Sequence, residues 1–299
     1  MTAAALSEEQ RLALLLRQLK WAEEKTEFYR DAFVRADIRA ASVTSFAEMA
    51  GVPFWEDAAK EGADAPFFML TLPLSGLLRV STLHDDAACG SIHCYTQGDV
   101  ARQVQTATDL LTAYGVNRAS TVLLAGDFTD GRTLDLQYAL DMIGAAVLPC
   151  TGGTAAQLLR AAVPDTVIAW EYELPAIAEA MGGLSLNRLI TIGTHPAPQD
   201  FAREMAQHMG ARHTHIFTLA QMGTLIGGAC SAGEGIHIEE RLFFAEVVDD
   251  VGTSSRADGA RGELVLSTLT AEAMPVLRYR TGLSVRFVRE RCGSVDARL

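Results

Sequence analysis

Two histidines in this sequence have a spacing that could support metal or acid–base chemistry. His213 and His215 lie two positions apart in a predicted strand, so their imidazoles share one face of that strand. A metal site on this face would need a third ligand, and the sequence offers no clear one. We therefore expect two partly buried imidazoles beside a pocket rather than a metal centre.

A second group of potential ligands is His84, Asp85 and Asp86, with His93 a few residues later. This set suggests a metal-assisted hydrolase as one function. A solvated loop is the commoner meaning of such a run, so we rank the hydrolase last. The pair Cys89 and Cys94 lacks the second cysteine pair of a zinc ribbon.

The bulk composition excludes several classes of function. The 299 residues carry a formal net charge of -12, which repels phosphate backbones and argues against a nucleic-acid partner. Residues 1–10 lack the pattern of a signal peptide, and the longest uncharged stretch, residues 216–233, is too polar to span a membrane. An odd cysteine count favours reduced thiols in a cytoplasmic protein. These cysteines are Cys89, Cys94, Cys150, Cys230 and Cys292.

Motif searches for the commonest nucleotide and hydrolase sites give nothing. The sequence contains no G-x-x-x-x-G-K-[ST] loop, no G-x-G-x-x-G after a strand and no G-x-S-x-G elbow. We therefore predict no catalytic residue from a local motif alone.

The elements that must position these residues alternate regularly from about residue 100. Apolar runs predict short buried strands, and stripes with helical spacing between them end at Gly115, Gly144 and Gly182. This alternation predicts a mostly parallel sheet covered by helices on both faces. The predicted strands are residues 121–125, 146–149, 166–169, 189–192 and 213–217, and the predicted helices include 173–181 and 199–209, with Thr154 capping another.

Outside this region the pattern changes. Residues 12–34 predict one helix, whose aromatic patch packs against the main body. After about Gly233 short strands separated by turns predict a small β-rich subdomain, with strands at 236–238, 242–248, 263–267, 275–279 and 285–288. The fold class is therefore α/β, with an α/β region at 1–233 and a β-rich subdomain at 234–299. Ligands should bind in the loops beyond the carboxyl ends of the parallel strands.

One long stretch of the C-terminal region carries a specific resemblance. Residues 259–281, ending in Arg-Tyr-Arg-Thr, strongly resemble the β-subdomain signature of phenylacetate–CoA ligases, which are adenylate-forming enzymes. The similarity extends over residues 10–281. Further segments that resemble this family are residues 28–31, 52–54, 144–154, 235–240 and 244–249.

The resemblance implies layered parallel sheets covered by helices, followed by a small β-rich subdomain, as in the large AMP-binding domain of the adenylate-forming fold. It also implies ATP, Mg²⁺ and coenzyme A as cofactors: the carboxylate is joined to AMP and then transferred to a thiol. Such chemistry needs a backbone cradle for the phosphates, a carboxylate for Mg²⁺, an acid for the ribose and a lysine on a mobile lid. The chain ends at Leu299, so we expect the lid domain to be absent.

Compared with the family, the phosphate loop is altered. Residues 81–91 precede the expected Tyr95-Thr96 pair but have few glycines, and they place Asp85 and Asp86 where phosphate would sit. A pair of like charges about 4 Å apart costs on the order of 4 kcal/mol at an effective dielectric of 20. We therefore expect weak triphosphate binding.

Two further positions depart from the family. The resemblance places Gln221 at the Mg²⁺-ligating glutamate and Leu283 at the ribose-binding aspartate. Neither side chain carries the charge that the family uses there, and Leu283 accepts no hydrogen bond. By the same resemblance we predict a cofactor-binding set of Gly193, Thr194, His195, Phe217, Thr218, Gln221 and Arg280, and a substrate pocket of Phe128, Thr151 and Tyr172.

These departures lead us to expect a degenerate ligase that cannot adenylate an acid alone. It would act as a binding or regulatory protein for a small carboxylic acid or acyl-thioester, or for a partner ligase or lid protein. The alternative is an active ATP-dependent acid–CoA ligase that works with a separate lid domain or on a bound acyl-adenylate.

Overall fold

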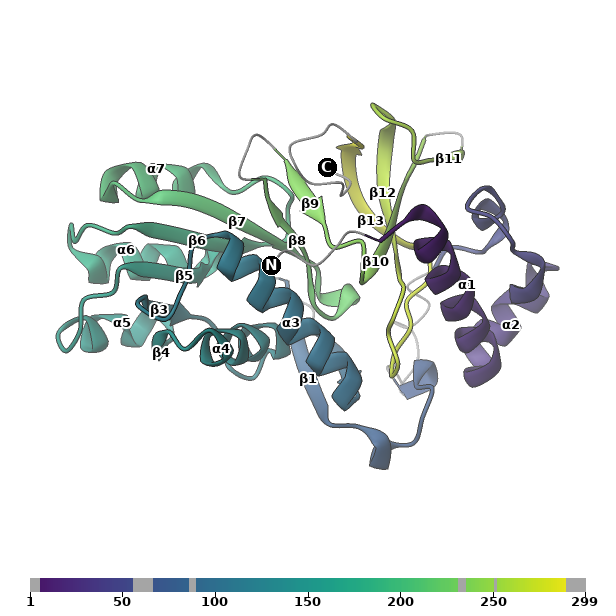
Figure 1. Cartoon of the computed structure of the whole chain (residues 1–299), viewed down its shortest axis with the longest axis horizontal. Coiled ribbons are helices and arrows are strands. Elements are labelled where there is room, and N and C mark those ends of the chain that lie inside the picture. The colour runs from purple at the N-terminus through teal and green to yellow at the C-terminus, as the bar shows by residue number, and fades with distance from the viewer. Residues whose placement is uncertain (1–5, 56–66, 86–89, 231–234, 250–251, 289–299) are drawn as a thin grey trace. The chain divides into compact units, whose positions relative to one another are not determined.

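The computed structural model describes residues 6–55, 67–85, 90–230, 235–249 and 252–288 (Figure 1). Two compact units divide the chain. One unit comprises residues 81–90 and 101–236, and the other comprises 1–80, 91–100 and 237–299. This grouping differs from the linear division at residues 233 and 234, because the N-terminal helices group with the C-terminal strands.

A parallel sheet forms the centre of the 81–90 and 101–236 unit. Its sheet has the strand order β4-β3-β5-β6-β7-β8-β9, in which β3 to β7 pair in parallel and β8 is antiparallel to β7. The strands are β3 (Thr121–Ala125), β4 (Ala146–Cys150), β5 (Thr166–Trp170), β6 (Arg188–Gly193), β7 (Arg212–Thr218), β8 (Leu225–Ala229) and β9 (Ile236–Ile238). The α/β fold class and its layered parallel sheet are confirmed.

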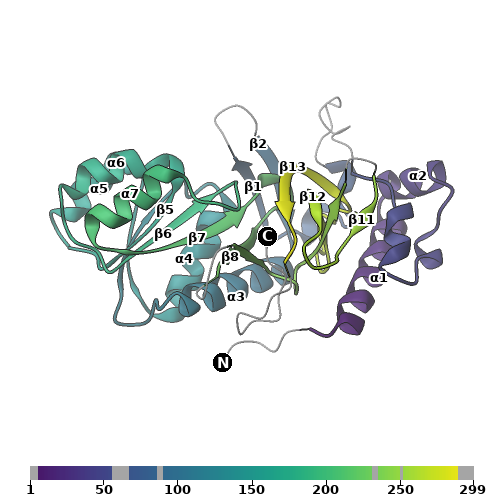
Figure 2. The same cartoon turned by 90° about the horizontal axis from the view of Figure 1, so that it is seen from above.

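Helices cover both faces of this sheet. Figure 2 shows α5, α6 and α7 on one face and α3 and α4 on the other. Every residue of β5 is buried, as expected for a strand covered on both sides. The helices are α3 (Gln97–Ala113), α4 (Gly131–Ile143), α5 (Gly152–Leu159), α6 (Leu174–Met181) and α7 (Asp200–Met209).

Glycines end three of these helices in the left-handed conformation that side chains disfavour. Gly144, Gly182 and Gly210 have φ of 81°, 55° and 66°. The start of α5 differs from the prediction, since Thr151 occupies the N-cap and the Thr154 hydroxyl receives the Thr151 amide at 3.1 Å.

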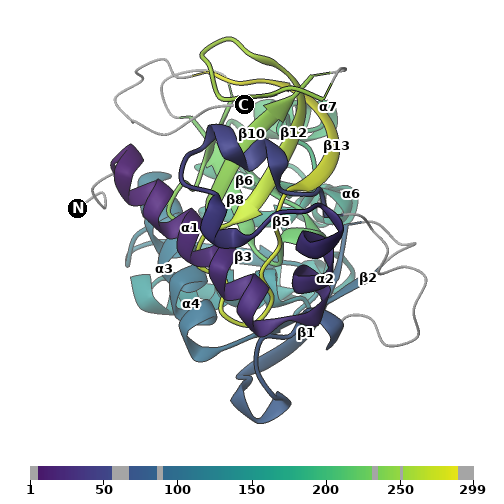
Figure 3. The same cartoon turned by 90° about the vertical axis from the view of Figure 1, so that its right-hand side faces the viewer.

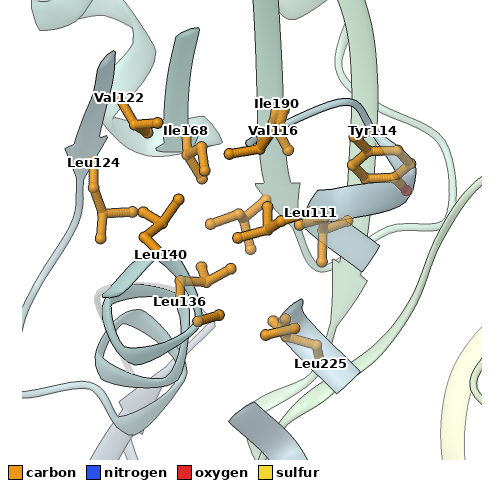
Figure 4. Close-up of a cluster of buried hydrophobic side chains, with 14 of the residues drawn as sticks. Leu111, Tyr114, Val116, Val122, Leu124, Leu136, Leu140, Ile168, Ile190 and Leu225 are labelled. Atoms are coloured by element: carbon orange, nitrogen blue, oxygen red, sulfur yellow. The ribbon is translucent and has the colours of Figure 1, made fainter. Parts of the chain in front are cut away.

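Each face of the sheet has its own hydrophobic core. Figure 4 shows the core beneath α3 and α4, where Leu111, Leu136 and Leu140 meet Ile168 and Ile190. A second core on the opposite face joins the strands to α5, α6 and α7. Because each fully buried leucine contributes roughly 1.5–3 kcal/mol, these two layers fix where the strand ends lie.

The other unit contains the N-terminal helices and an antiparallel sheet (Figure 3). The sheet has the order β11-β10-β12-β13, and β1 and β2 form a separate two-stranded sheet. The elements of this unit are α1 (Glu8–Lys25), α2 (Glu27–Arg35), β2 (Gly90–Tyr95), β10 (Phe243–Val248), β11 (Ser254–Ser255), β12 (Arg261–Thr268) and β13 (Tyr279–Arg286). Most of β1 (Arg79–His84) belongs to the 81–90 and 101–236 unit. Short 3₁₀ helices are Ala40–Ser42, Ala47–Gly51, Phe67–Met69, Leu74–Gly76, Glu171–Glu173 and Ala220–Met222.

Hydrogen bonds from the N-terminal helices hold the segment before β13. The Tyr29 hydroxyl donates to the Pro275 carbonyl and receives the Leu277 amide, both at 3.0 Å. The Trp21 indole N–H donates to the Glu272 carbonyl at 3.1 Å. These contacts explain why the N-terminal helices and the C-terminal strands belong to one unit, because residues 271–277 pack on the helices instead of forming a strand.

The structure differs from the predicted elements in one helix and in several strands. The helix predicted at 12–34 is broken at Thr26, whose side chain caps α2 by accepting the Tyr29 amide. Residues 275–278 of the strand predicted at 275–279 are irregular. Strand β13 begins at Tyr279 and runs through the predicted gap to Arg286, within the strand predicted at 285–288. Strands β1, β2 and β8 were not predicted, because polar residues and glycines interrupt their apolar patterns.

Replacing Leu140 with alanine tests the core beneath α3 and α4. Leu140 is fully buried, so we expect Leu140→Ala to lower the free energy of unfolding by about 2–5 kcal/mol. Met142 lies on the same helix with 61 % of its surface exposed, so Met142→Ala should change it by less than about 0.5 kcal/mol. Urea unfolding followed by circular dichroism measures both. Equal losses in the two variants would contradict this assignment of the core.

Candidate functional site

Two clusters of buried and half-buried polar side chains lie on the parallel sheet, one at the carboxyl ends of its strands and the other along β6 and β7. The arginine cluster consists of Arg132, Asp130 and Asp85. The histidine cluster consists of His213, Thr191, His215 and Glu171. All of these residues belong to the 81–90 and 101–236 unit.

Arg132 lies in the first turn of α4 and is completely buried. Its Nη2 donates to Asp130 Oδ2 at 2.7 Å, and its Nη1 donates to Asp85 Oδ1 at 2.8 Å. Asp130 is also the N-cap of α4 and receives the Arg132 amide at 2.8 Å. The guanidinium thus pairs with two carboxylates from separate parts of the chain, and charge-assisted bonds of this kind are the stronger ones.

Further contacts enclose the guanidinium. Its Nη2 also donates to the His84 carbonyl at 2.9 Å, and its Nη1 lies 3.4 Å from Thr218 Oγ1 at the end of β7. The centre of the guanidinium lies 4.5 Å from the centre of the Trp170 ring, at the end of β5. Arg132 therefore ties together the ends of three strands.

Asp85 does more than balance this charge. Both of its carboxylate oxygens receive the Ala220 amide, at 2.8 and 2.7 Å. The carboxylate thereby fixes the turn at 220–222, which carries Gln221. The solvated loop expected around Asp85 is wrong, because Arg132 and Ala220 hold this side chain. Asp86 and Cys89 lie outside the described residues.

An aromatic stack continues from Arg132. The Trp170 and Tyr172 rings stack with centroids 5.8 Å apart, and the Trp170 N–H donates to Thr133 Oγ1 at 2.9 Å. Tyr172 is 57 % exposed. Partial burial raises the pKa of Tyr172 to about 12, and the nearby carboxylates act in the same direction. These carboxylates belong to Glu173, Asp130 and Asp127.

The histidine cluster is a continuous chain of hydrogen bonds. Thr191 Oγ1 lies 3.0 Å from His213 Nε2 and 2.9 Å from His215 Nδ1. His215 Nε2 lies 2.9 Å from the carbonyl oxygen of His195. Glu171, after β5, receives the Gln199 amide at 2.8 Å. The predicted shared face of His213 and His215 is confirmed by their common contact with Thr191.

The predicted nucleotide residues fall at several places. Gly193 ends β6 and has no room for a side chain, since a Cβ atom there would lie 2.9 Å from His215 Cε1 and collide with Glu171. Thr194 is half-buried, and the exposed His195 receives the Ala197 amide on its imidazole at 3.1 Å.

The remaining predicted residues have mixed environments. Phe217 and Thr218 are fully buried, and the Thr218 hydroxyl donates to the Thr224 carbonyl at 2.9 Å. Gln221 is half-buried. Arg280 lies in the other unit, on β13, and bonds Glu263.

The three predicted pocket residues differ in exposure. Phe128 packs against the core beneath α3 and α4. Thr151 is the exposed N-cap of α5, and Tyr172 is an exposed ring that stacks on Trp170. Sequence reasoning missed Arg132, Asp130, Thr191 and Glu171. One signal was available: an aspartate two residues before an arginine, at a helix start after a buried strand.

Arg278, within the motif that resembles the ligases, is a structural residue. It is buried with φ of 52°, and its Nε donates to Glu246 at 2.7 Å. Its Nη1 donates to the Val52 carbonyl at 2.6 Å, and its guanidinium lies over the Phe54 ring. This pairing supports the interpretation that Arg278 persists because it builds the β-rich region.

The described residues contain neither a metal-ligand cluster nor a membrane-spanning helix. No three or more His, Cys, Asp or Glu side chains there are arranged to hold a metal ion. None of the helices described has the length and apolar character needed to cross a bilayer. Cys94 and Cys150 are buried free thiols.

Two curated proteins similar to this chain share one name. No family model matches the chain. The chain is 28% identical over 293 residues to a phenylacetate–coenzyme A ligase of Aromatoleum evansii, covering 92% of this chain and 66% of that protein. It is 29% identical over 291 residues to the enzyme of the same name from Escherichia coli K12, covering 90% and 65%.

Solved structures give the fold. A structure of 2-hydroxyisobutyryl-CoA ligase in an open conformation, in complex with 2-HIB-AMP and CoA, superposes with a TM-score of 0.87 at 18% identity. The superposition covers 98% of this chain and 73% of that one.

The chain is a phenylacetate–CoA ligase-like member of the adenylate-forming superfamily. The family resemblance found in residues 259–281 is thereby confirmed. This ligase-like chain spans less than two thirds of the curated relatives it matches, at 66% and 65% of their lengths.

Acid should destabilise this ligase-like protein through its buried histidines. Burial, together with Arg203 and the neighbouring histidines, lowers the pKa of His215 from 6.5 to about 4. Between these pH values the unfolded chain binds a proton that the folded chain does not. Stability therefore falls as pH falls through this window, with a slope of up to about 1.4 kcal/mol per pH unit from one group.

Urea unfolding between about pH 7 and about pH 5 measures this slope. His215→Gln removes one of the titrating groups and should flatten the curve. His208 is exposed on α7, so His208→Gln should leave the slope unchanged. A wild-type slope that persists in full in His215→Gln would contradict the assignment.

Proposed function

We propose that this chain is the acid-activating part of an ATP-dependent acid–CoA ligase, which joins a small carboxylic acid to AMP before transfer to CoA. Its relatives named phenylacetate–coenzyme A ligase match over nearly the whole chain. The structure of 2-hydroxyisobutyryl-CoA ligase, with the same fold, contains 2-HIB-AMP and CoA. These comparisons favour the active ligase over the degenerate one.

The observation that carries this proposal is the ion pair between Arg132 and Asp85. The sequence alone places two carboxylates, Asp85 and Asp86, in the phosphate loop, where they would repel ATP; Asp86 lies outside the described residues. In the structure Asp85 faces a buried guanidinium at 2.8 Å and the Ala220 amide. The main electrostatic objection to nucleotide binding is therefore smaller than the sequence suggests, because an opposite charge at this distance offsets the repulsion.

The residues fit ATP and Mg²⁺ only in part. At the position of the family's Mg²⁺ ligand, Gln221 offers a neutral amide oxygen, whereas Mg²⁺ is usually bound through carboxylates and substrate phosphates. In this proposal the 220–222 turn, fixed by Asp85, positions Gln221, and Tyr172, Phe128 and Thr151 line the acid pocket.

A second candidate is a protein that binds a small acid or an acyl-thioester without adenylating it. Gln221 and Leu283 favour this candidate, since both replace residues that the resemblance gives a negative charge. Leu283 is half-buried on β13 and its side chain accepts no hydrogen bond.

Acid-dependent exchange of labelled pyrophosphate into ATP separates the two candidates. The purified chain is assayed with Mg²⁺ and a panel of aryl and small hydroxy acids, together with thermal melting. For the ligase we expect exchange that requires both the acid and Mg²⁺. Melting shifts of several degrees with an acid but no exchange would instead identify the binding protein. Neither exchange nor a shift with any acid would overturn both candidates.

Gln221→Glu tests the metal position in the ligase. Restoring a carboxylate should lower the Mg²⁺ concentration for half-maximal exchange by about tenfold, the factor that corresponds to about 1.4 kcal/mol of binding energy. Gln207 is exposed on α7, so Gln207→Glu adds the same charge elsewhere and should leave the Mg²⁺ dependence unchanged. An unchanged or higher requirement in Gln221→Glu would remove Gln221 from the proposed metal position.

A further inference from the structure

The histidine cluster has a defined direction of hydrogen bonding. His215 Nε2 faces a carbonyl oxygen, which can only accept, so this nitrogen must carry the imidazole hydrogen. In a neutral imidazole Nδ1 is then an acceptor, and the Thr191 hydroxyl must donate to it at 2.9 Å. The hydroxyl has no second hydrogen, so His213 Nε2 must donate to Thr191 Oγ1 at 3.0 Å. One arrangement of hydrogens satisfies all three contacts.

This chain of bonds ends on the loop between β6 and α7. His215 donates to the His195 carbonyl within that loop, and Glu171 receives the amide of Gln199 at its far end. At its near end, Gly193 packs so closely on Glu171 and His215 that no side chain fits. Residues 193–199 are therefore held at both ends and at one point between them.

His215 is not arranged as an acid or base for a ligand. It is 1% exposed and both ring nitrogens are occupied. Glu171 lies 3.9 Å from Nδ1, which is an acceptor in the neutral ring, so this approach is no ion pair. The other charged or titratable groups that face the ring are His213, His195 and Arg203, and they oppose its protonation. The ring thus serves as a fixed donor.

We propose that His215, as the neutral Nε2–H tautomer set by Thr191, is the positioning residue of the β6–α7 loop. The loop carries Gly193, Thr194 and His195, the residues predicted to face the nucleotide. In the ligase proposed above, His215 therefore sets nucleotide affinity without touching the nucleotide. That consequence rests on the proposed function, whereas the positioning of the loop does not.

Two substitutions of His215 separate the effect of losing the hydrogen-bond donor from the effect of losing the imidazole ring. Glutamine can place its amide N–H near the position of Nε2 and keep the bond to His195. Asparagine is shorter and reaches only the position of Nδ1, so it loses that bond. In His215→Asn we expect hydrogen–deuterium exchange of a peptide covering residues 194–199 to rise about tenfold, as the loss of one hydrogen bond allows. In His215→Gln it should stay within about twofold of the wild type.

His208→Asn, at an exposed position of α7, is the matched control and should leave the exchange of this peptide unchanged. Equal exchange in the asparagine and glutamine variants overturns the proposal, whether both rise or neither does. If the asparagine variant fails to fold, ¹⁵N spectra of the wild-type imidazoles decide. They should show His215 protonated at Nε2 and unprotonated at Nδ1 at neutral pH, and the opposite tautomer overturns the proposal.

Nucleotide binding gives a second readout. For ATP we expect a KM or Kd about tenfold higher in His215→Asn, restored in His215→Gln, with kcat and the KM for the acid within about twofold of wild type. If the wild type binds no nucleotide, the proposed function fails, and the loop exchange alone decides the role of His215. If nucleotide affinity is equal in all variants while loop exchange differs, the effect on affinity is wrong and only the positioning stands.

Discussion

The carboxyl edge of the sheet depends on one buried charge. Arg132 is removed from water, and a buried guanidinium is tolerated only when carboxylates and hydrogen-bond acceptors replace its hydration. Asp130 comes from the same helix end, but Asp85 and the His84 carbonyl come from the end of β1, and Trp170 from the end of β5. Satisfying this one side chain therefore fixes three separate segments. Because Asp85 also receives the Ala220 amide, the requirement extends to the turn after β7.

The histidine cluster organises the neighbouring loop by the opposite means. Apart from Glu171, which accepts the Gln199 amide, its side chains are one hydroxyl and two neutral imidazoles. The direction of each bond among these three groups follows from how many hydrogens each group has. A charged cluster tolerates small changes in geometry because Coulomb attraction falls slowly with distance. A neutral chain holds its loop only while one tautomer persists. Ion pairs of the arginine cluster thus fix the turn at 220–222, whereas the placement of imidazole hydrogens fixes the β6–α7 loop.

Much of the fold could be predicted because local residue patterns indicate its strands and helices. Strand β3 was predicted with its bounds, and β5, β6 and β7 to within about a residue at each end, because apolar runs alternate with helices that end in glycine. The arginine cluster could not be predicted in this way. Arg132 reads as an ordinary polar residue in a first helical turn, and its burial depends on Asp85, 47 positions earlier in the chain. Asp85 could not be assigned a partner from the sequence for the same reason, since Arg132 is distant from it along the chain. Residues 275–278 show the converse, because their apolar run predicts a strand but the Pro275 carbonyl and the Leu277 amide bond the Tyr29 hydroxyl.

The arginine cluster also limits what the site can bind. One guanidinium faces two carboxylates, so the cluster keeps a single net negative charge even when every bond is made. An incoming phosphate gains nothing from Arg132 unless it displaces Asp85, and displacement would also release the Ala220 amide. Phosphate binding next to an intact cluster therefore needs a cation from elsewhere. Gln221, on the turn that Asp85 holds, is neutral and supplies no such charge. In the proposed ligase, nucleotide binding should therefore depend on a divalent cation.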